Sequence, residues 1–226
     1  MAVETLPETP AEESTSTYTL ADLIDQLDGV PPDRIRLRPT PGTATEAQLV
    51  AINEGKYGLC ELIDGTLVEK AVGIFESVLA AVLIRRIGNF LAGNRIGFVF
   101  GADAMFRMVS SNIRLPDVAF LRSDRFPGGK VPRIAVAEVP IDLAVEIKSP
   151  TNTWKELERK GREFFESGTR LYWIADPESE RVRVYESMKS YVEKTVDDEL
   201  DGAEVLPGFR LSIREWFAEA ENAGAS

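Results

Sequence analysis

Apolar and polar positions change period along the chain, and the changes predict alternating strands and helices. "CELIDGTLVEK" has two β-type runs around Asp64-Gly65, the dipeptide favoured in a tight hairpin. "GIFESVLAAVLIRRIGNFLAGN" carries apolar residues at helical spacing and predicts a long helix packed on a sheet. Strands then follow in "IGFVFG", "AMFRMV" and "LPDVAFL". Beyond a Pro/Gly-rich stretch, "IDLAVEIKSP" is a strand, "TNTWKELERKGREFFESG" a helix, and "RLYWIADP" and "RVRVYES" further strands.

This order of elements predicts an α/β sandwich in which a mixed β-sheet is flanked by helices. Residues 1–17 are rich in Pro, Glu, Thr and Ser without periodicity, so we expect a disordered acidic tail. Residues 18–56 read as a helical and Pro-rich extension, with short helices in "TLADLIDQLDG" and "EAQLVAINEG". Residues 57–217 form the predicted compact domain, and residues 218–226 a C-terminal tail.

Composition narrows the chemistry that the 226-residue chain can carry. It has one cysteine, Cys60, so a disulfide framework or a cysteine zinc cluster within one chain is excluded. It has no histidine, which excludes Ser-His-Asp and Cys-His nucleophiles and imidazole ligands. No stretch has the pattern of a secretory signal, and the apolar run "VLAAVLI" is too short to span a membrane. We therefore expect a cytoplasmic protein.

Charge is unevenly distributed along the sequence. The formal net charge of −11 argues against a polyanionic partner at first sight. Residues 81–135, however, hold nine basic side chains against three acidic ones, so we expect an electrically lopsided molecule. The nine are Arg85, Arg86, Arg95, Arg107, Arg114, Arg122, Arg125, Lys130 and Arg133.

Opposite charges stand at the end of the apolar strand "IDLAVEIKSP". Side chains alternate across a strand, so Glu146 and Lys148 share one face. A strand end emerging into solvent with a weak ion pair is one interpretation, and Glu-x-Lys by itself favours it.

Asp117 changes this balance, because it also lies inside an apolar run, "IRLPDVAFL", where a charge is costly unless it is paired or bound to a metal. If the two strands are neighbours, Asp117 and Glu146 converge beside a lysine. Oxygen ligands suit Mg²⁺ or Mn²⁺, with water completing the shell. Such a site fits phosphodiester hydrolysis without histidine.

These residues resemble the PD-(D/E)XK nuclease superfamily, with "PD" at Pro116-Asp117 and "EIK" at residues 146–148. The wider stretches "YGLCELIDGTLVEKAVGIFES", "IRLPDVAFL", "DLAVEIKSP", "ERKGREFFESGTRLYWIADP" and "LDGAEVLPGF" resemble the Uma family of putative restriction endonucleases, over roughly residues 20–217. The resemblance implies a restriction-endonuclease-like fold, a divalent metal (Mg²⁺ or Mn²⁺), DNA as substrate and often a homodimer.

Carried onto this chain, the resemblance implies metal ligands at Asp117, Glu146 and the Ile147 backbone carbonyl. Lys148 is the position of the catalytic lysine. Many relatives have an apolar residue there and a lysine on the following helix, which matches Lys160 here. By its spacing Lys160 faces the sheet, although an ordinary surface lysine is equally consistent with the pattern.

Two glutamates and four basic residues are further candidates for the site. Glu76 matches an acidic position of the family's first long helix and could reach a metal through water, but a first-turn glutamate is also favoured by the helix dipole. Glu61 recurs in the family, without a role that we can assign. Four basic residues occupy the loop between the two acidic strands, where we expect them near the metal as phosphate contacts or simply as surface charges. They are Arg122, Arg125, Lys130 and Arg133.

Three functions fit this sequence. The first is a metal-dependent DNA endonuclease in which Asp117 and Glu146 hold the ion and Lys148 or Lys160 assists. The second is a catalytically inactive member of the fold, acting as a dimeric binding or regulatory module whose acidic surface prevents tight association with DNA. The third is a metal-dependent hydrolase of a small phosphate ester.

Overall fold

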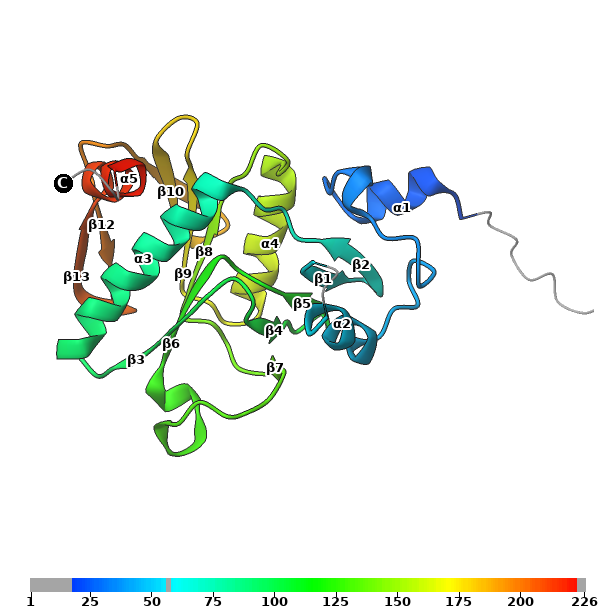
Figure 1. The fold of residues 1–226 in the computed structure, drawn as a ribbon, viewed down its shortest axis with the longest axis horizontal. Coiled ribbons are helices and arrows are strands. Elements are labelled where there is room, and N and C mark those ends of the chain that lie inside the picture. The colour runs from blue at the N-terminus through cyan, green and yellow to red at the C-terminus, as the bar shows by residue number, and fades with distance from the viewer. Residues whose placement is uncertain (1–17, 56–57, 223–226) are drawn as a thin grey trace, which may run out of the picture.

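The computed structural model describes residues 18–55 and 58–222 (Figure 1). The predicted disordered tail, residues 1–17, lies outside the described residues, as do residues 223–226. No helix in the described segments is both long enough and apolar enough to cross a membrane.

A six-stranded mixed sheet forms the centre of the protein and confirms the predicted α/β architecture. Strands β8 and β9 run parallel, and each of the other neighbouring pairs is antiparallel. In spatial order the strands are β11 (Ser190–Lys194), β10 (Arg181–Ser187), β9 (Leu171–Asp176), β8 (Leu143–Ile147), β6 (Val118–Arg122) and β3 (Gly97–Phe100).

Alternating side chains give this sheet two apolar faces, each covered by helices. Val145 and Ile147 belong to the core formed with α3 (Ile74–Gly93), α5 (Ile213–Asn222) and the hairpin of β12 (Glu199–Gly202) and β13 (Leu206–Ser212). Ala144 faces the other way, into the core with α4 (Trp154–Glu166). Helix α4 is thus the crossover that joins parallel strands β8 and β9.

A second, five-stranded sheet lies beside the first and carries the predicted hairpin. Its order is β2 (Thr66–Glu69), β1 (Cys60–Ile63), β5 (Ile113–Arg114), β4 (Met105–Arg107) and β7 (Val136–Ala137). Asp64 and Gly65 have φ of 47° and 68°, as a type I′ turn requires. Helix α2 (Glu46–Asn53) packs on this sheet through Leu49.

The N-terminal extension is tied to both the hairpin and α4. Helix α1 (Leu20–Gln26) begins at Thr19 with a capping box, and the 3₁₀ turn η1 (Pro32–Arg34) follows. The buried Arg34 guanidinium forms two hydrogen bonds, of 2.9 and 2.8 Å, with the carboxylate of Glu156 on α4. Figure 1 shows α1 at the end of the molecule opposite α5.

The strands β11, β12 and β13 are absent from our predicted elements. The side chains of β11 are exposed or half-buried, so they show no apolar alternation, and β12 is the polar segment "ELDG". Helix α5 continues through Asn222, past the expected start of the C-terminal tail.

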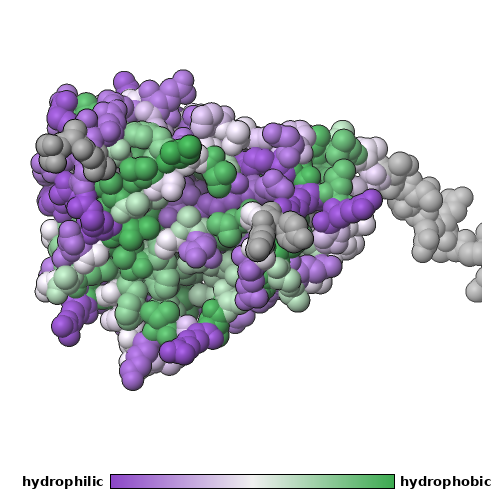
Figure 2. All heavy atoms as spheres, in the orientation of Figure 1, coloured by the Kyte–Doolittle hydropathy of each residue, from purple (hydrophilic) through white to green (hydrophobic). Residues whose placement is uncertain are grey.

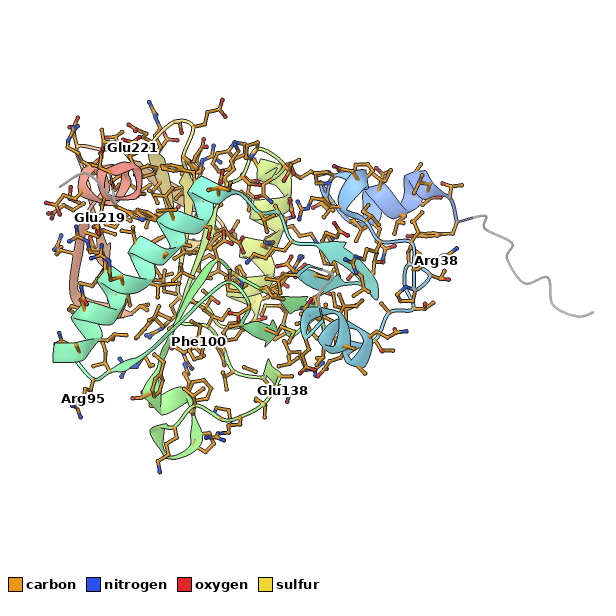
Figure 3. The ribbon with its side chains drawn as sticks, in the orientation of Figure 1. Arg38, Arg95, Phe100, Glu138, Glu219 and Glu221 are labelled. Atoms are coloured by element: carbon orange, nitrogen blue, oxygen red, sulfur yellow. The ribbon has the colours of Figure 1, made fainter. Side chains whose placement is uncertain are left out.

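Apolar side chains also reach the surface, on the face shown in Figure 2, below α3. Phe100, labelled in Figure 3, lines a shallow groove there with exposed Val131 and Ile134. The 3₁₀ turns η2 (Ser123–Arg125) and η3 (Pro127–Gly129) begin the long loop that leads to this groove.

Candidate metal centre

Asp117 and Glu146 meet at one end of the central sheet. Asp117 comes directly before β6, Glu146 lies near the end of β8, and Val118 pairs with Val145 across the two antiparallel strands. The Ile147 amide donates a hydrogen bond of 2.7 Å to Asp117 Oδ2. Because the N–H and C=O of a strand residue point to the same side, the Ile147 carbonyl is also directed toward this segment.

Glu146 is buried and only half satisfied. Its side chain is 4% exposed, and Oε2 accepts a hydrogen bond of 3.1 Å from Lys160 Nζ. Oε1 has no hydrogen-bond partner within the described residues. Burial raises the pKa of Glu146 to about 7; Lys160 opposes this shift, while the negative charge of Asp117 adds to it. An unsatisfied buried carboxylate oxygen beside a second carboxylate fits a cation ligand.

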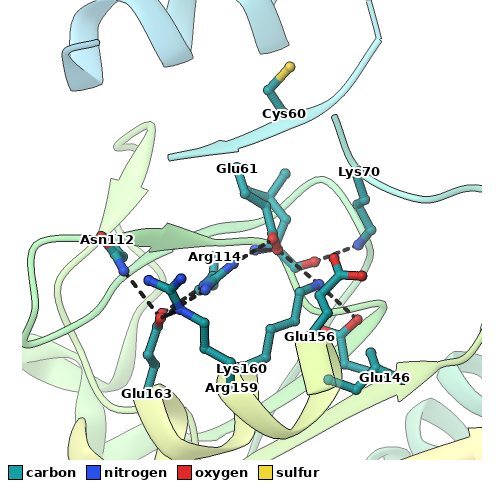
Figure 4. Close-up of polar contacts among 12 residues, drawn as sticks. Cys60, Glu61, Lys70, Asn112, Arg114, Glu146, Glu156, Arg159, Lys160 and Glu163 are labelled. Atoms are coloured by element: carbon teal, nitrogen blue, oxygen red, sulfur yellow. Dashed lines mark hydrogen bonds and ion pairs between the residues drawn. The ribbon is translucent and has the colours of Figure 1, made fainter. Parts of the chain in front are cut away.

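Lys160 comes from α4 and points into the site, between two carboxylates (Figure 4). Its Nζ lies 3.1 Å from Glu146 Oε2 and 3.2 Å from Glu61 Oε1. Burial alone lowers the pKa of Lys160, but the charges of Glu146 and Glu61 outweigh it and raise the pKa above its usual value. The amine is therefore held as an ammonium ion.

Glu61, whose role the sequence left open, links the site to a buried ion network. Its Oε1 accepts a hydrogen bond of 2.9 Å from the Leu115 amide, and its Oε2 lies 3.0 Å from Arg114. Arg114 in turn pairs with Glu163 of α4 at 2.7 Å. Burial raises the pKa of Glu61, but Lys160 and Arg114 outweigh it, and the pKa falls to about 2. An acidic side chain inside an apolar run is the sequence signal that marks Glu61, as it marks Asp117.

Lys148 shares a sheet face with Glu146 but turns toward β9. Its Nζ lies 3.6 Å from Asp176 Oδ1 and 5.7 Å from the centre of the Trp154 ring. Lys160, rather than Lys148, thus places its ammonium on the Glu146 carboxylate.

A cleft of about 190 Å³ is lined in part by Asp117 and Ile147. Glu76 and Lys70 line the same cleft. The Glu76 carboxylate folds over the first turn of its own helix, where a Cβ on Gly73 would collide with it. This position is the one that the helix dipole favours.

The basic loop lies at the end of the sheet opposite Asp117 and Glu146, contrary to our prediction that it lies near the metal. Asp117 comes directly before β6 and Glu146 lies near the end of the antiparallel β8, so the loop from β6 to β8 connects the ends of these strands that lie away from both acids. At about 3.4 Å per residue, the five residues of β6 place Arg122 roughly 17 Å from Asp117. Arg122 pairs with Asp124 and Arg125 with Asp142, whereas Lys130 and Arg133 are exposed.

The excess of positive charge in residues 81–135 is also largely neutralised in three dimensions. Arg86, for example, pairs with Glu219 of α5 at 2.8 Å, and Figure 3 shows Glu219 and Glu221 on that helix. Among the residues that the structure describes, six of the nine basic residues form ion pairs: Arg85, Arg86, Arg107, Arg114, Arg122 and Arg125. The lopsidedness seen in the sequence is therefore weaker in the folded protein.

The oxygen atoms available at this site suit a metal ion that keeps several of its water ligands. Within residues 18–55 and 58–222, no group of three or more Cys, Asp or Glu side chains is arranged to hold a metal. Asp117, Glu146 and the Ile147 carbonyl supply oxygen donors only, and Mg²⁺ commonly binds one or two carboxylates with several waters.

Comparison with known proteins identifies the chain's relatives. A crystal structure of a putative nuclease of the DUF820 group from Anabaena variabilis superposes with a TM-score of 0.66 and 19% sequence identity, over 73% of this chain and 93% of that one. This likeness establishes the shared fold. A search of curated proteins gave no match. Residues 48–214 match the Uma2 family, described as "Putative restriction endonuclease", and the chain therefore belongs to that family.

Proposed function

We propose that the protein is a DNA endonuclease that hydrolyses phosphodiester bonds with Mg²⁺ or Mn²⁺. The observation that carries the proposal is the unpaired, buried Oε1 of Glu146 beside Asp117 and the Lys160 ammonium. Membership of the Uma2 family supports DNA as the substrate. A divalent ion at such a site lowers the pKa of water and stabilises negative charge on phosphoryl oxygens.

The residues of the site have two proposed roles, binding the metal ion and stabilising negative charge. Asp117, the free oxygen of Glu146 and the Ile147 carbonyl are the proposed ligands. Lys160 holds the second oxygen of Glu146 and fixes the orientation of the carboxylate. As a permanent ammonium it stabilises negative charge rather than abstracting a proton.

The exposed Lys130 and Arg133 are proposed as DNA contacts away from the scissile bond. Their loop begins at Arg122, roughly 17 Å from Asp117 by the rise of a strand. At about 3.4 Å per nucleotide step, this separation corresponds to about five steps of duplex DNA. The loop would therefore orient the duplex by its phosphates while the cleft holds the bond to be cleaved.

A cleavage assay tests the proposal. Supercoiled plasmid, linear duplex and a small phosphodiester are incubated with the protein and Mg²⁺ or Mn²⁺. We expect DNA cleavage to fall by at least ~100-fold in Asp117→Asn and in Glu146→Gln. The matched control is Glu221→Gln, which neutralises an exposed carboxylate on α5 and should leave cleavage unchanged.

Each alternative function has its own result in this assay. Undiminished cleavage by both site variants would reject the assigned ligands. Metal binding without cleavage of any substrate would indicate the binding or regulatory module, and cleavage of the small ester alone would indicate the third function. A homodimer and a cytoplasmic location are further predictions from the sequence; sedimentation of the purified protein tests the first, and cell fractionation the second.

A further inference from the structure

Lys70 is a buried cation at the candidate metal centre. The sequence pattern assigned no role to this lysine. It follows β2, and its side chain is only 3% exposed. Its Nζ lies 3.0 Å from Asp117 Oδ1, on the carboxylate oxygen that the Ile147 amide leaves free. The chain therefore brings its own positive charge to a proposed metal ligand.

The surroundings of the Lys70 ammonium are those of a cation site. Besides Asp117, Nζ donates to the carbonyl oxygens of Leu115, at 2.5 Å, and Ala102, at 3.2 Å. An ammonium has three N–H donors, so these three oxygens use all of them. One carboxylate and two backbone carbonyls are also ligands that a hard divalent cation accepts.

This position bears on how many ions the centre can hold. In sites with two metals, the ions lie about 3.5–4 Å apart. A carboxylate commonly bridges two ions by offering one oxygen to each, and Lys70 already holds Oδ1 of Asp117. The acid that could complete a second ion's shell, Glu76, lines the same cleft, but its carboxylate lies over Gly73 at the start of α3.

We propose that the Lys70 ammonium is a tethered substitute for a second divalent cation beside Asp117, so that the centre takes one divalent ion. This inference rests on the proposed function, because it concerns the same metal centre. Removing the ammonium frees Asp117 Oδ1 and two carbonyl oxygens, and it deletes a positive charge that repels an incoming ion.

Mn²⁺ binding to the full chain tests the inference without any need for activity. Titration calorimetry gives the number and affinity of the ions, and electron paramagnetic resonance distinguishes an isolated Mn²⁺ from two coupled ions. Ions that still bind to Asp117→Asn are subtracted as background. We expect one isolated ion in the wild type, and in Lys70→Met two coupled ions with the first bound at least ~10-fold more tightly.

Lys148→Met is the matched control, because it removes the same charge near the centre from a lysine that pairs with Asp176. It should retain one isolated ion. A coupled pair in the wild type, or a single ion bound no more tightly in folded Lys70→Met, would overturn the inference. If Lys70→Met fails to fold by circular dichroism, the wild-type spectrum decides: an isolated ion supports the inference and a coupled pair rejects it.

The two proposals can fail separately. If neither the wild type nor Lys70→Met binds an ion that depends on Asp117, the metal centre itself is refuted, together with this inference. If the ions bind as expected but no DNA is cleaved, the endonuclease proposal fails and the role of Lys70 stands.

Discussion

Replacing Lys160 with methionine should strongly destabilise the protein, in a way that depends on pH. Methionine keeps most of the side-chain volume and removes the charge. The Lys160 ammonium lies within 3.2 Å of two buried carboxylates, those of Glu146 and Glu61, and 3% of its side chain is exposed. The variant therefore leaves both carboxylates without this partner.

The expected loss of unfolding free energy is about 3–5 kcal/mol at pH 8, the usual effect of removing one partner from a buried ion pair. Glu146 already has a pKa raised from 4.5 to about 7. At about 1.4 kcal/mol per unit, this shift costs the wild type about 3 kcal/mol once Glu146 is ionised. Lys160 opposes the shift, so its removal must raise the pKa of Glu146 further.

The sign of the pH effect follows from this raised pKa. Between pH 4.5 and about 7, unfolded Glu146 is ionised while the folded residue holds a proton, so wild-type stability falls as pH rises. Above about pH 7 the wild-type contribution levels off. In Lys160→Met the pKa is higher, so stability continues to fall above pH 7. The difference between the two proteins should therefore be larger at pH 8.5 than at pH 6.

Urea unfolding followed by fluorescence of the buried Trp173 and Trp216 measures the difference at each pH. Lys155→Met, on the same helix with a 67% exposed side chain, is the matched control and should cost ~0–1 kcal/mol. Adding Glu146→Gln to Lys160→Met should restore part of the loss, because the stranded charge is removed. A loss below about 1 kcal/mol at pH 8.5, or one that does not change with pH, would refute the reasoning.

Three further changes test other parts of the account. Glu61 has a pKa lowered to about 2, so its ionised form stabilises the fold above pH 4.5 and that stability is lost as pH falls toward 2; Glu61→Gln should flatten an acid titration of stability followed by circular dichroism in that window. Gly161→Ala should lower the melting temperature despite the better helix propensity of alanine, because the new Cβ would lie 2.8 Å from a Tyr172 ring carbon; an unchanged melting temperature would contradict this packing. Arg133→Ala should weaken DNA binding at low salt and reduce the salt slope by about one, which fluorescence anisotropy measures.

The sequence predicted the fold because the strands around the site are continuous apolar runs and the helices have apolar residues at helical spacing. Asp117 and Glu146 stood out because a charge inside an apolar run is costly without a partner. The helical spacing of "WKELERKGREFF" was enough to direct Lys160 toward the sheet.

Other features depend on tertiary contacts that no local pattern records. Lys70 follows Glu69 in what reads as an ordinary polar strand end, and only the return of the chain at Leu115 and Asp117 surrounds its ammonium with oxygens. The misplaced basic loop had a different cause. Asp117 comes directly before one strand and Glu146 lies near the end of its antiparallel neighbour, so the loop that connects the two strands must lie at the far end of the sheet.

Calorimetric titration of Mg²⁺ or Mn²⁺ into the wild type and Glu146→Gln at pH 8 tests the central claim most directly. Glu158→Gln, which neutralises a 40% exposed carboxylate on the same helix as Lys160, is the control. We predict that the wild type and the control take up an ion and that Glu146→Gln loses this binding. Equal ion binding by all three proteins would contradict the claim that the unpaired Glu146 oxygen is a metal ligand.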